Sequence, residues 1–166
     1  ALDTNHLIEY SHGNIEVLPM PSDKHQSILG HLYTDFLALA AKTRGKVLFS
    51  PLRLRLWPGK IREPDLPFLA SARDPRRQNQ FWSGADLVVE VVSPDDPERD
   101  LMTKRREYAQ AGIPEYWIVD PRSGTISVLT LVGTSYQEES YGRGQQARSV
   151  NFPDLSVDVA AALDAD

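Results

Sequence analysis

The stretch that decides the fold is Asp86-Leu87-Val88-Val89-Glu90-Val91-Val92-Ser93. Its valines and leucine leave neither face polar, a pattern typical of a β-strand buried on both faces. Glu90 stands in the middle of this apolar run. An ionised carboxylate in an apolar layer is costly unless a cation pairs with it. We therefore expect Glu90 either to reach water at the end of the strand or to have a cationic partner.

The segment after this strand offers a candidate partner. Residues 97–111 have the pattern of a helix, in which Leu101, Lys104 and Tyr108 share one stripe. Glu90 and Lys104 each lie about 10 Å from the strand–helix turn, measured along their elements. The two side chains should therefore come level and form an ion pair. The alternative is a lysine that extends outward to solvent.

Asp65 is a second candidate carboxylate, placed after Pro64 in what reads as a neighbouring strand. Two carboxylates on adjacent strands can hold Mg²⁺ or Mn²⁺ and leave positions for water and phosphate. A nearby lysine can orient or deprotonate that water, or stabilise developing charge. His25 lies on the apolar stripe of the helix expected after Ser22, where a structural role competes with a catalytic or metal role.

The remaining patterns predict an α/β chain with a mixed sheet, organised as one domain over residues 1–166. In chain order, the first expected elements are a hairpin at 7–18, a helix from 22 to 44 stopped by Gly45, a strand at 47–57 with a return at 61–66, and a loop at 70–84. After the central strand and its helix, we expect a strand at 116–119 parallel to the central strand, antiparallel strands at 126–131 and 135–141, and a short helix within 152–163.

Charge is distributed unevenly along the chain. The net charge is −5, yet residues 44–77 carry nine basic and three acidic residues. Such a segment on an acidic protein can mark a nucleic-acid surface, although a solvated charged hairpin is an equal alternative. The candidate nucleic-acid-binding side chains are those of Arg53, Arg55, Arg62, Arg76 and Arg77.

Two absences narrow the class of protein. The chain has no cysteine, which excludes disulfides, thiolate catalysis and cysteine-based metal sites. A reducing cytoplasm is the expected location. No apolar run approaches ~20 residues, so no membrane-spanning helix and no membrane partner are expected.

Three motifs carry a resemblance that covers nearly the whole chain. They are Pro64-Asp65, the run from Leu87 to Pro94, and Asp100, Lys104 and Tyr108 followed by the run from Ala111 to Pro121. Together they resemble the Uma family of restriction-endonuclease-like proteins, once catalogued as a domain of unknown function, in the PD-(D/E)XK nuclease superfamily. The resemblance implies an αβββαβ core with an N-terminal hairpin and C-terminal antiparallel strands.

The resemblance also implies a metal-dependent nuclease site. Asp65 and Glu90 would be the metal ligands for Mg²⁺ or Mn²⁺, Lys104 the catalytic lysine and His25 an auxiliary catalytic residue. One departure matters, because Val92 replaces the lysine that the superfamily has two positions after the acid. Lys104 on the following helix would substitute for it.

The expected function is thus a metal-dependent endonuclease that cleaves DNA. The first alternative is a catalytically silent nucleic-acid-binding or regulatory module, in which Glu90 and Lys104 form a structural ion pair. The second alternative is a nuclease that acts on RNA or on nucleotides. A homodimer is compatible with the resemblance, since the exposed hairpins could pair, but no residue pattern establishes the oligomer.

Overall fold

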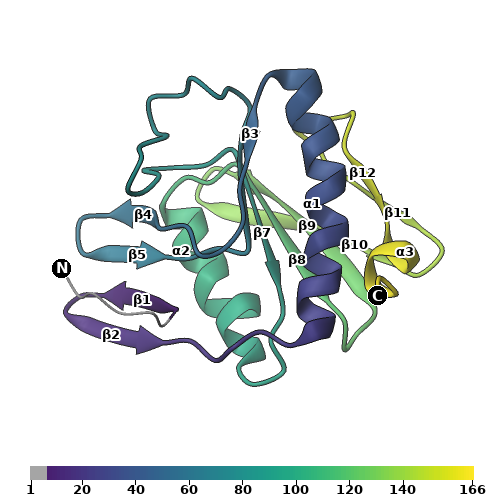
Figure 1. Cartoon of the computed structure of the whole chain (residues 1–166), viewed down its shortest axis with the longest axis horizontal. Coiled ribbons are helices and arrows are strands. Elements are labelled where there is room, and N and C mark those ends of the chain that lie inside the picture. Colours follow the sequence, from purple (N-terminus) through teal and green to yellow (C-terminus); the bar gives the residue numbers. More distant parts are fainter. Residues whose placement is uncertain (1–6) are drawn as a thin grey trace.

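A mixed six-stranded sheet forms the centre of the protein in the computed structural model, which describes residues 7–166 (Figure 1). The strands are given in their order across the sheet. They are β10 (Ser135–Gly142), β9 (Thr125–Val132), β8 (Glu115–Asp120), β7 (Leu87–Val91), β6 (Leu66–Leu69) and β3 (Lys46–Val47). The α/β prediction with a mixed sheet is therefore confirmed.

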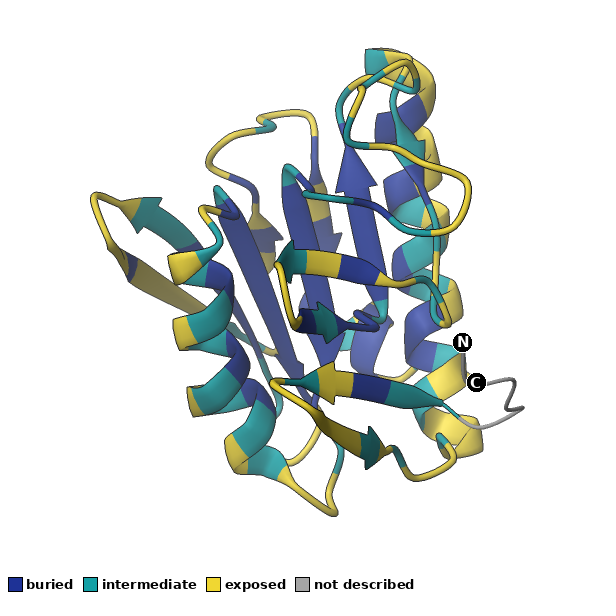
Figure 2. Cartoon of the chain, turned by 90° about the vertical axis from the view of Figure 1, so that its left-hand side faces the viewer, coloured by how far each residue is buried: buried dark blue, intermediate teal, exposed yellow. Residues whose placement is uncertain are grey.

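Helices cover both faces of this sheet, as the edge-on view shows (Figure 2). The long helix α1 (Asp23–Thr43) packs on one face, and η1 (Arg99–Lys104) with α2 (Arg105–Gln110) on the other. Each helix layer has its own apolar core, one around Phe36 and Trp117 and the other around Tyr108 and Tyr116. The central strand is therefore enclosed from both sides.

Strand β7 is the buried strand that the valine pattern predicts, since all five of its residues are buried. It runs parallel to β8, with Glu90 opposite Ile118, and antiparallel to β6, with Val89 opposite Leu66. The parallel pairing follows from the helical connection, because a helix returns the chain to the same end of the sheet.

Helix α1 starts as its sequence predicts but ends differently. The Ser22 hydroxyl accepts the His25 N–H at 3.2 Å and caps the first turn. At the other end Arg44, not Gly45, adopts the left-handed conformation, with φ of 58°. Gly45 is needed for another reason, because a Cβ there would lie 2.4 Å from the Leu69 carbonyl oxygen. The glycine permits close packing on β6.

The strand expected over residues 47–57 is wrong as a single element. Its first residues form β3 of the central sheet, and its last form β4 (Leu54–Trp57) of a second sheet. Pro51 lies between them and has no N–H to donate to a ladder. The expected return over 61–66 divides in the same way around Pro64, into β5 (Lys60–Arg62) and β6.

The second sheet, here called the small sheet, has the order β2-β1-β5-β4. Its hairpin of β1 (Ile8–Ser11) and β2 (Asn14–Val17) confirms the first predicted element. The loop of residues 70–84 packs against β4, where Trp82 is 1% exposed and its N–H donates to the Arg53 carbonyl at 2.8 Å. Packing rather than base stacking is therefore the role of Trp82.

The C-terminal part completes the fold. Strands β9 and β10 are antiparallel, as expected, and β11 (Gln146–Arg148) pairs with β12 (Ser156–Asp158). The last helix, α3 (Val159–Leu163), is capped by the Asp158 carboxylate, which accepts the Ala161 N–H at 2.8 Å. Within residues 7–166 no helix is long and apolar enough to cross a membrane.

Candidate functional site

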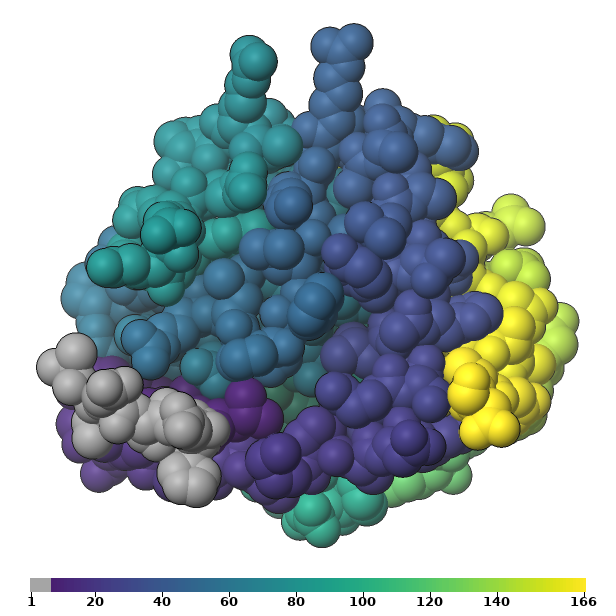
Figure 3. Space-filling view, viewed as in Figure 1, coloured from purple at the N-terminus to yellow at the C-terminus, as the bar shows by residue number. Residues whose placement is uncertain are grey.

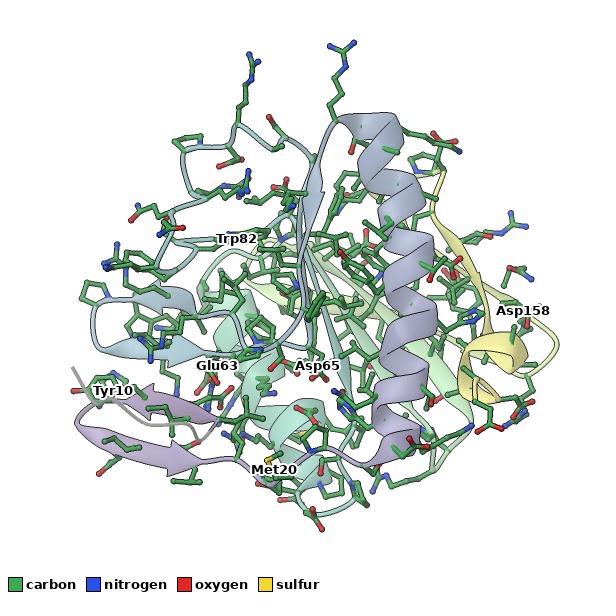
Figure 4. The ribbon with its side chains drawn as sticks, viewed as in Figure 1. Tyr10, Met20, Glu63, Asp65, Trp82 and Asp158 are labelled. Carbon is green, nitrogen blue, oxygen red and sulfur yellow. The ribbon has the colours of Figure 1, made fainter. Side chains whose placement is uncertain are left out.

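A pocket of about 530 Å³ lies where β7 ends and η1 begins. It brings together all four side chains predicted to act in catalysis, those of His25, Asp65, Glu90 and Lys104. Figure 4 shows Asp65 between the small sheet and α1, with Met20 below it on the connection from β2 to α1. The residues come from four separate segments, so only the tertiary fold assembles the site.

Glu90 and Lys104 form the expected ion pair. Lys104 Nζ lies 2.9 Å from Glu90 Oε2, and the Tyr108 hydroxyl donates to Glu90 Oε1 at 2.6 Å. Glu90 is 2% and Lys104 5% exposed. The central carboxylate is therefore held on one side by a charge and on the other by a neutral donor, both from the helix that follows β7.

The helix after β7 departs from a regular α-helix, and this shapes the site. Its segment η1 has π geometry, which is frequent at functional sites. Asp100 turns inward as well, with Oδ1 2.9 Å from Lys104 Nζ. Arg99 reaches Glu16 at 2.8 Å and also contacts Glu9. Arg99 lies outside the α-helical stripe of Leu101, Lys104 and Tyr108, so that stripe does not predict its inward direction.

Burial and neighbouring charges act on the central pair in opposite senses. Burial raises the pKa of Glu90; the Lys104 charge counteracts this and the Asp65 charge adds to it. Burial lowers the pKa of Lys104, but the carboxylates of Glu90 and Asp100 outweigh it and leave that pKa raised. Lys104 is therefore a firmly protonated ammonium. It is suited to positioning and charge stabilisation rather than to removing a proton from water.

Asp65 is held beside Glu90 by the main chain of β7. Its Oδ2 accepts the Val91 N–H at 2.8 Å, and His25 Nε2 lies 3.2 Å from the same oxygen. Burial lowers the pKa of His25, but the hydrogen bond to Asp65 and the Asp65 charge outweigh it, so this pKa is raised. His25 thus contacts a predicted ligand and acts as its orienting partner.

Three buried side-chain atoms in the described part of the chain make no hydrogen bond. They are Glu63 Oε2, Arg99 Nε and Asp100 Oδ1, and all three residues line the pocket. Asp100 Oδ1 is nevertheless paired by charge, because Lys104 Nζ lies 2.9 Å from it, so Glu63 Oε2 and Arg99 Nε are the exceptions. Buried polar atoms are nearly always paired in native proteins, so such exceptions need an explanation. Their concentration at one pocket marks it as the place where a bound molecule or ion would complete the hydrogen bonding.

The donor set agrees with a hard divalent cation. Asp65 and Glu90 supply carboxylate oxygens, and Mg²⁺ is commonly held by one or two carboxylates while it keeps several waters. Each Glu90 oxygen retains a free lone pair beside its present hydrogen bond. Among residues 7–166 no three His, Cys, Asp or Glu side chains are grouped to hold a metal ion. Asp65 and Glu90 are thus the two candidate protein ligands in the pocket, and the lining offers no closed cage among the described residues.

Sequence reasoning missed three pocket residues. Asp100 lies four positions before Lys104, and this helical spacing could have found it. Glu63 alternates with Asp65 around Pro64, is 7% exposed and has its pKa raised by burial. Arg99 could not have been found, because its direction depends on the π geometry.

One predicted nucleic-acid-binding residue is wrongly assigned. Arg62 is 2% exposed, and its guanidinium contacts the carboxylates of Glu9, Glu16 and Glu107. A side chain enclosed in this way does not reach a phosphate backbone. The alternation of strand β5 turns Arg62 inward, toward the helix beneath the small sheet.

The other four predicted arginines lie outside the pocket lining. Arg53, Arg55 and Arg77 are exposed, and Arg55 lies 4.4 Å above the Phe81 ring. Arg76 is bound to Asp74 and Asp86, yet its side chain stays 37% exposed. The space-filling view shows side chains projecting from the 70–84 loop, in teal, and from the end of α1, in blue (Figure 3). The basic side chains that line the pocket are instead those of Lys24, His25, Arg99, Lys104 and Arg122.

The mixed α/β fold of this chain is shared with a solved structure. A solved structure described as a "putative nuclease belonging to DUF820" from Anabaena variabilis ATCC 29413 superposes with a TM-score of 0.80. It shares 19% identity, over 98% of this chain and 93% of that one, which establishes a common fold. Among curated proteins, none matches the chain.

The family model described as "Uma2: Putative restriction endonuclease" matches residues 2–160. The chain therefore belongs to the Uma2 family. This confirms the resemblance drawn from the Asp65, Glu90 and Lys104 motifs.

Proposed function

We propose that this protein is a metal-dependent endonuclease that hydrolyses DNA phosphodiester bonds. The observation that supports this most is the convergence of Asp65, Glu90, Lys104 and His25 in one pocket of a Uma2-family chain. Two buried atoms of the same pocket that make no hydrogen bond, Glu63 Oε2 and Arg99 Nε, add to it. We further propose that residues 1–166 act as one nuclease-like domain; the cytoplasmic location stays a prediction.

Each pocket residue has a role in this proposal. Asp65 and Glu90 would hold Mg²⁺ or Mn²⁺, which when bound would polarise the phosphate and lower the pKa of a water. Lys104 stabilises negative charge on the phosphate, and Glu90 and Asp100 fix its position. His25 orients Asp65. The positive charges of Arg99 and other lining cations would attract the DNA backbone.

The exposed arginines would extend this contact. Arg53, Arg55, Arg76 and Arg77 lie on β4 and the 70–84 loop, where they could bind phosphates that flank the cleaved bond. Such contacts position DNA without reading its sequence. DNA is the proposed partner, and the same arginines would also bind RNA.

Asp65→Asn gives the cleanest test of the proposed activity. The amide keeps an oxygen for the Val91 N–H but removes the charge that a metal needs. We expect wild-type protein to nick DNA with Mg²⁺ or Mn²⁺ and the variant to lose this activity at unchanged thermal stability. Duplex, single-stranded and branched DNA, RNA and free nucleotides serve as substrates, and Glu139→Gln, on exposed β10, is the matched control.

Failure of the wild-type protein to cleave any of these substrates with either metal would contradict the enzyme proposal. Cleavage of RNA or nucleotides alone would instead support a nuclease that acts on RNA or on nucleotides. Equal activity in Asp65→Asn and Glu139→Gln would remove Asp65 from the site.

A silent binding module is the second candidate, and one observation favours it. Both oxygens of Glu90 already have partners, Lys104 and Tyr108, as in a structural ion pair. Calorimetric titration with Mn²⁺ separates the two candidates. Binding that disappears in Asp65→Asn supports the enzyme, whereas no binding and a melting temperature unaffected by Mn²⁺ support the silent module.

A further inference from the structure

The pocket combines buried charges with an apolar lining. Glu90 and Lys104 are almost inaccessible to solvent, so a phosphate reaches them only by entering the pocket. Apolar side chains from the β2–α1 connection, from the segment after β3 and from the ends of β7 and β8 form much of the remaining wall. They include Leu18, Met20, Pro51, Val92, Pro94 and Pro121. A phosphate alone needs no apolar wall, so the bound group should carry both a phosphate and an apolar surface.

An unpaired nucleotide has this combination of properties. Its phosphate is charged, and both faces of its base are flat aromatic surfaces. In a duplex these faces are covered by the neighbouring bases, and only the base edges reach the grooves. A duplex is also stiff over lengths far greater than this cavity of about 530 Å³. A strand can therefore bend a whole nucleotide into the pocket only where that nucleotide is unpaired.

The polar atoms of the wall fit the same occupant. Glu63 and Arg99 meet at Glu9, because the Glu63 N–H donates to Glu9 Oε1 at 3.1 Å and Arg99 contacts the other oxygen. Figure 4 shows Glu63 on the side of Asp65 that faces the small sheet. Within residues 7–166, Glu63 Oε2 and Arg99 Nε are an acceptor and a donor that make no hydrogen bond. The Watson–Crick edge of a base offers a donor and an acceptor, and this edge is free only in an unpaired base.

An exposed aromatic ring lies beside the pocket. Phe49 is 52% exposed and packs at 90° to the ring of Tyr33 on α1, with the ring centroids 5.1 Å apart. The next residue, Ser50, lines the pocket, and its N–H donates to the Asp65 carbonyl at 3.0 Å. The main chain next to Phe49 is thus fixed to a proposed metal ligand. A ring held in this place offers a surface on which a base can stack.

We propose that the pocket takes an unpaired nucleotide of a DNA strand and that a neighbouring base of the same strand stacks on Phe49. This inference rests on the proposed function and deepens it, because it names the form of DNA that reaches Asp65 and Glu90. The phosphate of the nucleotide lies at Lys104, and its base lies against the apolar wall. Fully paired DNA contacts the exposed arginines without reaching the buried charges.

The first test measures binding by the full chain without cleavage. A fluorescent DNA strand, alone or paired with its complement, is titrated in EDTA at one salt concentration, and anisotropy reports binding. We expect the single strand to bind at least about tenfold more tightly than the duplex. Phe49→Ala should weaken single-strand binding about tenfold, the size of one lost base–aromatic stack, and leave duplex binding unchanged.

Two further variants make this test specific for stacking. Phe49→Trp should keep the single-strand affinity, because it retains an aromatic face. Val132→Ala is the matched control, since it shortens a side chain 51% exposed on β9, and it should have no effect. Equal affinity for single strand and duplex would overturn the proposal. An effect of Phe49→Trp as large as that of Phe49→Ala, or no effect of Phe49→Ala, would overturn the stacking on Phe49.

The second test separates this inference from the proposed function. With Mg²⁺ or Mn²⁺, a duplex that carries one unpaired nucleotide should be cut beside that nucleotide, and the fully paired duplex should stay intact. Equal cleavage of both duplexes would overturn the inference and leave the endonuclease proposal standing. Tighter binding of the single strand in EDTA without cleavage of any DNA would overturn the endonuclease proposal and support the pocket's preference for an unpaired nucleotide.

Discussion

Two clusters of buried charge lie on either side of η1, and they differ in how completely the charges are paired. The closed network beneath the small sheet has Arg62 at its centre, bound to Glu9, Glu16 and Glu107. The pocket cluster has Lys104 at its centre, bound to Glu90 and Asp100. The four residues of the first do not line the pocket and meet it only through Arg99, which contacts Glu9 and Glu16, whereas the second lines it.

The carboxylates of the two clusters respond in opposite ways. Burial raises the pKa of Glu9, but Lys104, Arg62 and Arg99 outweigh burial and lower this pKa to about 2. In Glu90 burial dominates and the pKa is raised. Several cations and a main-chain donor thus stabilise the charged form of Glu9, whereas Glu90 has one cation, Lys104, and one neutral donor, Tyr108. The comparison teaches that burial of charge alone does not distinguish a candidate site; the balance of neighbouring charges and a place beside a pocket do.

The largest expected effect follows from opening the closed network. Arg62→Met would leave buried Glu9 without one of its two guanidinium partners, Arg62 and Arg99, and breaking a buried pair in this way costs about 3–5 kcal/mol. Urea denaturation measures the free energy of unfolding. Arg106→Met is the control, because Arg106 is exposed on α2. It should change the free energy of unfolding by less than about 0.5 kcal/mol. A small effect of Arg62→Met would show that the network is not structural.

Acid should weaken the same network. The pKa of Glu9 is lowered from 4.5 to about 2, so its contribution is complete above pH 4.5 and is lost as the pH falls toward 2. A shift of that size corresponds to about 3 kcal/mol. We expect urea denaturation at pH 5 and pH 3 to show a marked loss of stability in the wild type. If Arg62→Met loses as much as the wild type over this range, Glu9 is not the group responsible.

A substitution in the pocket cluster should have a large effect on activity and a small effect on the free energy of unfolding, unlike Arg62→Met. Glu90→Gln removes a charge that burial disfavours, and Lys104 keeps Asp100 as a partner. We expect metal-dependent cleavage to fall at least about a hundredfold, equivalent to about 2.7 kcal/mol of transition-state stabilisation. The free energy of unfolding should change by less than in Arg62→Met. If Glu90→Gln lost as much stability as Arg62→Met, the pocket cluster would stabilise the fold in the same way as the network around Arg62.

The smallest expected effect concerns the neutral donor of the pocket. Tyr108→Phe removes the hydroxyl that donates to Glu90 Oε1 at 2.6 Å. A hydrogen bond to a carboxylate contributes about 1.5–3 kcal/mol, and protonation of Glu90 would reduce the loss. We expect Tyr108→Phe to lower the free energy of unfolding by an amount near the lower end of this range, measured by urea denaturation. Tyr136→Phe is the comparison, because it loses a hydrogen bond to the neutral carbonyl of Ile113. A larger cost than that of Arg62→Met would reverse the proposed ranking.

Much of the main architecture could be predicted from local patterns. The valine run of β7, the capped start of α1 and the parallel β7–β8 pair follow from hydrophobic periodicity and turn residues. Periodicity fails at residues 47–66, because alternation alone cannot tell one continuous strand from two that join different sheets. Prolines at positions 51 and 64 mark the breaks, but they do not say which sheet each half joins.

The sequence by itself determined that a carboxylate would stand in a fully buried strand and that Lys104 would come level with it. These conclusions need only strand and helix geometry. The tertiary structure decided which charges point inward. The π geometry of η1 turned Arg99 toward the interior, and the place of β5 in the small sheet buried Arg62 instead of exposing it. The physical reason is that the direction of a side chain depends on its partners across the packing interface. These partners come from distant parts of the chain, so the spacing of nearby residues does not predict them.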